Sequence, residues 1–440
     1  MVWARVSGSP LLVGSPSLRS APRASLRVPR APYDPTSVHK TLEFYAAQVR
    51  YDPGSAISLA LLAGQYLESY RETGDSADAT RAEQAARASL AIRKHRNSAA
   101  YFQLSRALLT QHRFDEALQN ARLAAREEPT GFRECADIEV ELGDYQNAQR
   151  DLRKFPARGQ DPAFLALASR FNELRGDSRG QVALLQQAAP QADENSEIPP
   201  QSVAWFHERL GRALSMTGRL DEAEKSYHKA LQVFPRDYRT MAALAHLYAV
   251  RGEWKRSIEW AEKAAAIVPA PETLALLGDA YSALGLREKA QSQFRLVEQI
   301  GALSRAQGVI YDRQRALYYA DHNRNLQEAV RLARGELRFR HDIYTFDTLA
   351  WTLFKANRIS EAETYSKRAL ALGTRDASLF FHAGMIAAAQ KKPALARTYL
   401  KRALEINPFF HPSQPALARQ TLSRLNGTSP GSSTIQTASY

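Results

Sequence analysis

The chain has 440 residues, of which 44% are hydrophobic and 24% are charged, a composition typical of a folded globular protein and not of a collagenous or low-complexity chain. Its formal net charge is +13, and no stretch approaches the ~18 uninterrupted apolar residues that a membrane-spanning helix needs. The single cysteine excludes an intrachain disulfide and a cysteine-rich zinc site. We therefore expect a folded chain without a membrane span.

Residues 1–36 form an N-terminal arm with six prolines, six serines and five arginines against one acidic residue, Asp34. The prolines oppose a helix, and the short apolar cluster at 11–13 is far below the core of a secretory signal. The arm is therefore either disordered, a targeting segment, or the product of a start codon placed too early. The compartment stays open, with the cytoplasm as the default.

The rest of the chain has a helical period that repeats. We expect a degenerate N-terminal array over 37–190, an acidic, proline-bounded linker or long loop over 191–201, a C-terminal array with a capping helix over 202–425, and a disordered polar tail over 426–440. In the C-terminal array, Leu210-Gly211 and Tyr227 recur 34 residues later as Leu244-Ala245 and Ala261. A period of this length with two helices per unit predicts a solenoid.

Small residues recur at two places in each unit. Gly211, Gly278 and Gly384 stand in the first helix, and alanines such as Ala223 and Ala290 stand in the second. We expect small residues to face small residues, so that the two backbones approach closely.

This pattern resembles the tetratricopeptide repeat. The resemblance covers most of residues 37–425, with strong units at 204–235, 238–269, 271–300 and 377–408, good units at 98–129 and 343–374, and weaker units at 56–95, 130–156, 162–190 and 303–341. Nine or ten units result, followed by a capping helix at 412–425. The resemblance implies an all-α fold, a right-handed superhelical solenoid of antiparallel helix pairs.

No catalytic motif has the context it needs: there is no phosphate loop, zinc-binding helix, calcium loop or nucleophile elbow. The histidines are scattered, and Cys135 is more simply a buried, inert thiol than a nucleophile. We therefore expect no enzyme, no metal and no cofactor.

In the family that the chain resembles, the first helix of each unit lines a concave groove that binds ligands. Carried over to this sequence, the groove positions hold Arg212, Arg239, His246, Asp279, Tyr344, Trp351, Phe354 and Phe381. Trp351 and Phe381 are equally compatible with packing between helices. The Lys and Asn clamp of tetratricopeptide co-chaperones is absent, because its places hold Glu208 and Arg212, then Ala242 and His246.

The leading functional hypothesis is a non-catalytic scaffold that binds a protein or peptide segment of unknown identity in its groove and assembles a complex, without a small-molecule substrate. Two alternatives remain: a regulatory array, and a nucleic-acid-binding protein acting through its basic surface. Nucleic acid is disfavoured because the basic residues alternate with acidic ones and not with aromatic ones.

Overall fold

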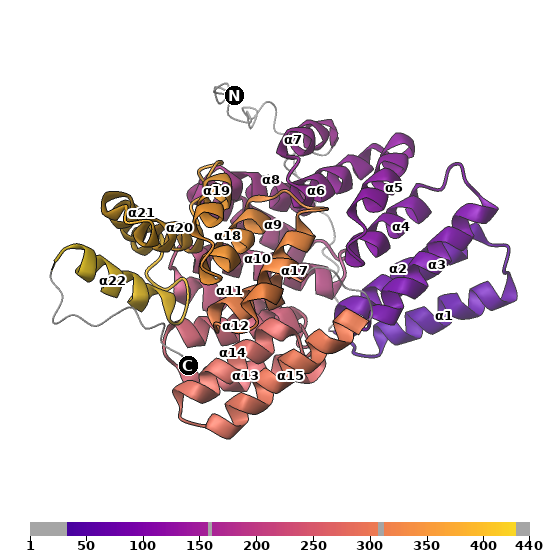
Figure 1. Cartoon of the computed structure of the whole chain (residues 1–440). Helices are drawn as coiled ribbons and strands as arrows, with labels where there is room; N and C mark the ends of the chain where they lie inside the picture. Colours follow the sequence, from indigo (N-terminus) through magenta and orange to yellow (C-terminus); the bar gives the residue numbers. More distant parts are fainter. Residues whose placement is uncertain (1–32, 157–160, 307–311, 428–440) are drawn as a thin grey trace.

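The computed structural model describes residues 33–156, 161–306 and 312–427, where the backbone forms α-helices, one 3-10 helix and no strand. Ten antiparallel helix pairs follow one another in a solenoid (Figure 1). The first helices of the pairs are α2 (Ala56–Thr73), α4 (Ser98–Thr110), α6 (Phe132–Leu142), α8 (Pro162–Leu174), α10 (Pro200–Met216), α12 (Tyr238–Val250), α14 (Pro271–Ala283), α16 (Arg313–Asp321), α18 (Ile343–Lys355) and α20 (Ala377–Ala389). The second helices are α3 (Ser76–Ile92), α5 (Phe114–Glu127), α7 (Tyr145–Lys154), α9 (Ser178–Glu194), α11 (Leu220–Val233), α13 (Trp254–Ile267), α15 (Arg287–Ala306), α17 (Leu326–Glu336), α19 (Ile359–Ala369) and α21 (Pro393–Ile406).

Each of the ten units expected from the sequence coincides with one helix pair, the weak units included. Two single helices flank the pairs, α1 (Ser37–Tyr51) and α22 (Gln414–Leu425), and the 3-10 helix η1 (Pro129–Gly131) precedes α6. The fold is therefore the all-α solenoid that the sequence predicts. No helix in the described ranges is long and apolar enough to cross a bilayer.

The expected linker at 191–201 is mostly helical. Helix α9 continues through Pro190 to Glu194, and α10 begins at Pro200, so only 195–199 connect them. The two helices pack together, and His207 Nε2 lies 3.1 Å from the Asp193 carboxylate across this junction. The solenoid thus continues through the junction, while the division into two arrays stays a prediction.

Most of the N-terminal arm and nearly all of the tail lie outside the described residues. The arm's last residues are described, and the Tyr33 ring packs edge-on against Phe234 with their centroids 5.1 Å apart. Phe234 follows α11 directly and is buried. The end of the arm therefore contacts the middle of the solenoid.

Glycines in the first helices are needed for a different reason from the one expected. A Cβ atom on Gly278 would lie 2.4 Å from the Phe294 ring, and one on Gly211 would lie 2.5 Å from the Tyr227 ring. Both distances are too short for real contacts. A large ring of the second helix, and not a small residue, therefore fills the space beside each glycine.

The solenoid coils back on itself, so that the fifth or sixth unit further along contacts the starting one. The loops before α18, α20 and α22 meet the end of the first helix in an earlier pair, and two of the hydrogen bonds between them join residues 192 and 200 positions apart. The bonds join His341 N to Leu142 O (2.9 Å), Thr374 Oγ1 to Leu174 O (2.5 Å) and Asn407 Nδ2 to Ser215 O (3.0 Å). Consecutive superhelical turns are therefore in direct contact.

One glycine shows how tightly these turns meet. Gly143, between α6 and α7, has a φ of +84°, and a Cβ there would lie 2.5 Å from the backbone carbonyl carbon of His341. Only glycine combines a left-handed backbone with so close an approach of another backbone.

Candidate binding surface on the inner face

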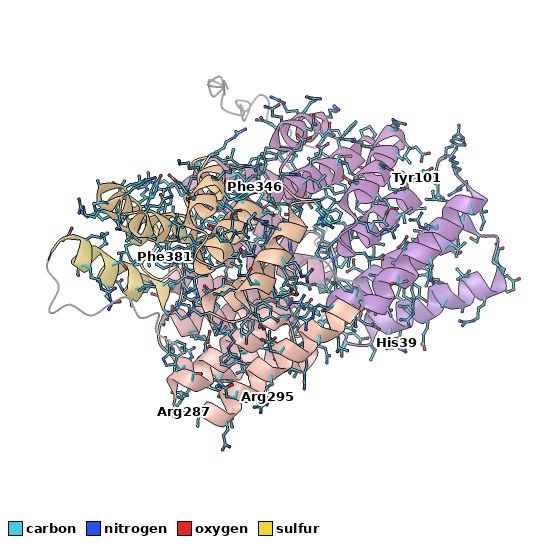
Figure 2. The ribbon with its side chains drawn as sticks, viewed as in Figure 1. His39, Tyr101, Arg287, Arg295, Phe346 and Phe381 are labelled. Atoms are coloured by element: carbon cyan, nitrogen blue, oxygen red, sulfur yellow. The ribbon has the colours of Figure 1, made fainter. Side chains whose placement is uncertain are left out.

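The first helices form one continuous side of the solenoid. Most first helices contact the first helix of the next pair, for example α2 with α4 and α16 with α18. Stacked repeats with a small rotation between them curve, and the curvature creates an extended concave surface. We call the surface formed by the ten first helices the inner face. Figure 2 shows Arg287 and Arg295 of the second helix α15 at the lower edge of the molecule.

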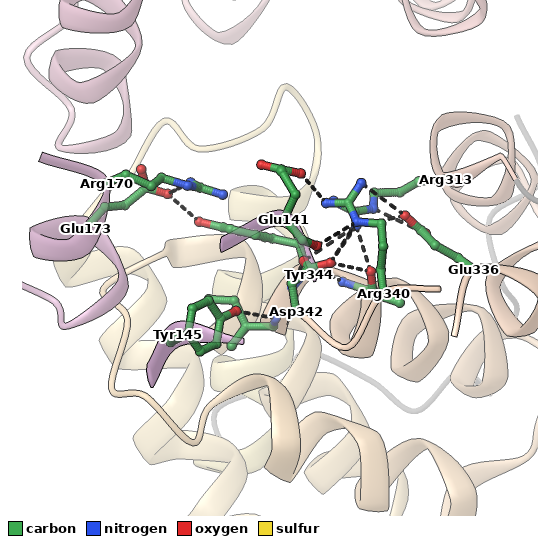
Figure 3. Close-up of polar contacts among 11 residues, drawn as sticks. Glu141, Tyr145, Arg170, Glu173, Arg313, Glu336, Arg340, Asp342 and Tyr344 are labelled. Carbon is green, nitrogen blue, oxygen red and sulfur yellow. Dashed lines mark hydrogen bonds and ion pairs between the residues drawn. The ribbon is translucent and has the colours of Figure 1, made fainter. Parts of the chain in front are cut away.

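A cluster of charged residues joins two superhelical turns (Figure 3). Arg340 Nη2 contacts Glu141 Oε2 at 2.5 Å, and Arg313 Nη2 contacts Asp342 Oδ2 at 3.1 Å. The backbone N–H of Ile343 donates to the Tyr145 hydroxyl at 3.1 Å. We call this set the inter-turn contact. Its arginines already have carboxylate partners, so it stabilises the coil and leaves no cation free for a ligand.

Beside the inter-turn contact, the carboxylate of Glu173 on α8 is hydrogen-bonded to three side chains of the protein. It accepts hydrogen bonds from Arg170, from the Tyr344 hydroxyl at 2.8 Å, and from Gln181 Nε2 at 3.1 Å. The Arg170 guanidinium lies 5.3 Å from the centre of the Tyr344 ring. Tyr344, a candidate from the sequence, is half-buried and holds two superhelical turns together through its hydroxyl.

Helix α10 presents a polar row to solvent on the inner face. Arg212 is exposed, Glu208 and Arg209 are half-buried, and Trp205 keeps 41% of its surface exposed. The Arg209 guanidinium lies 5.5 Å from the centre of the Trp205 ring. Burial and the neighbouring charge of Arg212 lower the pKa of Arg209, and burial raises the pKa of Glu208. These groups touch solvent, yet the surrounding protein weakens their hydration.

Two of the four aromatic residues expected in the C-terminal part of the groove are core residues. Trp351 is 3% exposed and Phe381 is fully buried. The Trp351 ring stacks on His382 with their centroids 4.1 Å apart and on Phe354 at 5.1 Å, and its Nε1 donates to Asp321 at 2.8 Å. Packing therefore accounts for Trp351 and Phe381, because neither offers area to a ligand, whereas Phe354 is half-buried and keeps solvent access.

The remaining candidate residues, His246, Asp279 and Arg239, differ in their burial and in their polar partners within the protein. His246 is half-buried, and burial together with His411 and Arg212 lowers its pKa to about 4, so its imidazole is neutral at neutral pH. The Asp279 carboxylate pairs with His322 Nε2 at 2.8 Å. Arg239 is exposed and donates to a single backbone oxygen at 3.3 Å, that of the α2 residue Arg71.

The described residues hold no group of three His, Cys, Asp or Glu side chains placed to bind a metal ion. Cys135 is fully buried, and burial raises the pKa of its thiol to about 12. A thiol with such a pKa stays protonated at neutral pH and is a poor nucleophile.

Models of the tetratricopeptide repeat family match residues 204–237 and 348–409. These segments hold the pair α10 and α11 and the four helices α18–α21. The chain is a tetratricopeptide repeat protein. Tetratricopeptide repeat proteins are generally non-catalytic interaction scaffolds. No curated protein sequence matches the chain.

Solved structures resemble this tetratricopeptide repeat protein at low identity. One chain in the crystal structure of the APC/C hetero-tetramer Cut9-Hcn1 is 14% identical to this chain. The match covers 89% of this chain and 93% of the Cut9-Hcn1 chain, with a TM-score of 0.34. Yeast Tom70 is 10% identical over 85% and 95%, with a TM-score of 0.36. A tetratricopeptide repeat protein from Parabacteroides merdae is 20% identical over 61% and 100%, with a TM-score of 0.33. Likeness at this level carries no argument about partners.

Proposed function

We propose that this protein is a non-catalytic scaffold that binds an extended segment of another protein along its inner face and so holds a complex together. The proposal rests on the combination of groups that the inner face presents on α10, where arginines with solvent access lie beside the exposed ring of Trp205. On the second helices, some charges pair within one helix, as in Lys263 with Glu259 and Arg331 with Glu328, both at 2.6 Å, while Arg287 and Arg295 form no ion pair with a described residue. On the inner face, Arg209 and Arg212 keep solvent access and form no ion pair with any described residue.

Unpaired arginines beside an exposed aromatic ring matter because binding gains most where polar groups are not yet satisfied. An outer pair that is already satisfied gives a ligand little, since it must be broken before it can bind. Arginine and aromatic side chains, by contrast, carry a large share of the binding energy in protein interfaces. Phe354, Trp205 and the α10 arginines are therefore the best-placed contacts for a protein segment.

The experiment that tests this proposal selects short peptides from a random display library against the full chain. A photo-crosslinking benzoylphenylalanine is then introduced at Glu208 or His246 on the inner face, or at Lys229 or Arg295 on the outer second helices. The selected peptides should crosslink from the inner positions and not from the outer ones. Crosslinks that come mainly from Lys229 and Arg295 would contradict binding on the inner face.

A further inference from the structure

Arg209 and Arg212 are two cations of α10 that keep solvent access, and the Arg209 guanidinium lies over the Trp205 ring. Neither forms a hydrogen bond or an ion pair with another residue in the described part of the chain. The arginines nearby are used: Arg170 pairs with Glu173, and Arg340 pairs with Glu141. Arg170 and Arg340 therefore stabilise the fold, whereas Arg209 and Arg212 remain open to solvent.

The acidic residues nearest this pair do not satisfy it. Glu173 already accepts three hydrogen bonds, from Arg170, Tyr344 and Gln181. Glu208 lies close enough for its charge to act on both arginines, but it forms no hydrogen bond or ion pair with either of them. Each guanidinium has five N–H donors in a planar fork, so the pair offers several unmade hydrogen bonds on one helix face.

We propose that Trp205, Arg209 and Arg212, which we call the α10 arginine site, bind an acidic segment of the partner protein through carboxylate side chains. This inference rests on the proposed function and adds the chemistry of the segment. A guanidinium fork matches the two oxygens of a carboxylate, which it binds with two parallel hydrogen bonds. The exposed Trp205 ring adds a platform for an apolar side chain next to the acidic ones.

The spacing of the two arginines fits an extended segment. Side chains three residues apart on a helix start ~5–6 Å from each other. In an extended chain, alternate side chains point to the same side at a spacing of ~6.5–7 Å. Acidic residues at alternate positions of the segment can therefore reach Arg209 and Arg212 together. The net charge of +13 favours the approach of an acidic partner over long distances.

A nucleic acid fits this surface less well. Glu208 directly precedes Arg209 on α10 and its charge acts on both arginines, and Asp137 of α6 lies near Arg209. A continuous phosphate backbone would have to pass these carboxylates and would be repelled by them. Separate carboxylates on a peptide can contact the arginines one by one and avoid the acidic positions.

The experiment uses the full chain and fluorescent synthetic peptides of equal length and equal apolar content. One peptide has glutamates at alternate positions, one has glutamines there, and one has lysines. A labelled oligo-uridylate is the nucleic-acid probe. Binding is measured by fluorescence anisotropy for the unaltered chain, for Arg209→Gln with Arg212→Gln, and for Arg287→Gln with Arg295→Gln. Arg287 and Arg295 are exposed and lie on the outer helix α15, so the control removes the same charge elsewhere.

The glutamate peptide should bind at least about tenfold more tightly than the glutamine peptide. The Arg209→Gln, Arg212→Gln variant should lose this preference, and the Arg287→Gln, Arg295→Gln variant should keep it. Equal losses in both variants would attribute the effect to net charge and overturn the inference, as would tightest binding of the lysine peptide or of oligo-uridylate. Inner-face crosslinks from glutamine peptides without acidic preference would overturn the acidic site alone, whereas the absence of any inner-face crosslink would overturn the proposed function itself.

Discussion

Replacement of Trp351 by alanine should strongly destabilise the C-terminal units. The side chain is 3% exposed, so the substitution removes a buried indole and leaves a cavity among Phe354, Phe381 and His382. Substitutions of this kind cost about 3–5 kcal/mol of unfolding free energy. The Asp321 carboxylate also loses the Nε1 donor at 2.8 Å, which adds to the cost.

Trp205→Ala is the matched control, because Trp205 keeps 41% of its surface exposed. Its removal should cost about 1 kcal/mol or less, as is usual for a surface position. Urea unfolding followed by circular dichroism gives both costs, and hydrogen exchange in α18–α20 locates the loss. Similar losses of unfolding free energy in the two variants, or a stable Trp351→Ala chain, would refute the conclusion that Trp351 belongs to the core. Trp351 would then again be a candidate for the binding surface.

Three further predictions follow from the geometry of the solenoid. Gly278→Ala should cost about 1–3 kcal/mol, because its Cβ would lie 2.4 Å from the Phe294 ring, and thermal unfolding checks this. Arg340→Ala breaks the ion pair with Glu141, so the superhelical turns should separate and the radius of gyration in small-angle X-ray scattering should rise; an unchanged radius would argue against a role for this contact in coiling. The pKa of His246 is lowered to about 4 in the folded state, so stability should fall as the pH drops from about 6.5 to 4, and His246→Asn should flatten this pH dependence in urea titrations.

The helix pairs could be predicted because their signals are local. Small residues, turn glycines and prolines recur at fixed distances, and each helix pair makes most of its contacts with its neighbours in the chain. The weak units at 130–156 and 303–341 are helix pairs as well, although they depart from the pattern, because α6 with α7 and α16 with α17 fill the same places in the stack. The length of the repeat therefore predicts a helix pair even where individual residues depart from the pattern.

The contacts between superhelical turns could not be predicted. Glu141 and Arg340 are 199 residues apart, and their meeting depends on the pitch of the whole coil, which sums many small rotations between units. For the same reason, Glu173 had no visible link to Tyr344. Arg209 was missed because it falls outside the family's binding positions in its unit. The sequence signal for it is the spacing of Trp205, Arg209 and Arg212, which places all three on one face of a helix.

The sequence could not decide whether Trp351 is buried or exposed, for a different reason. Family positions describe which side of a helix a residue occupies, but they do not say how deeply it lies. Phe354, His382 and Phe381 converge on Trp351 from two helices, and that convergence depends on the angle between α18 and α20. Arg212, at a comparable position on α10, remains exposed.

The most direct test of inner-face binding is a structure of the full chain with a selected peptide bound. Binding on the inner face predicts peptide density along the first helices, beside Arg212 on α10 and reaching toward His246 on α12. Peptide density confined to the second helices, or to the outer surface of α15, would contradict it.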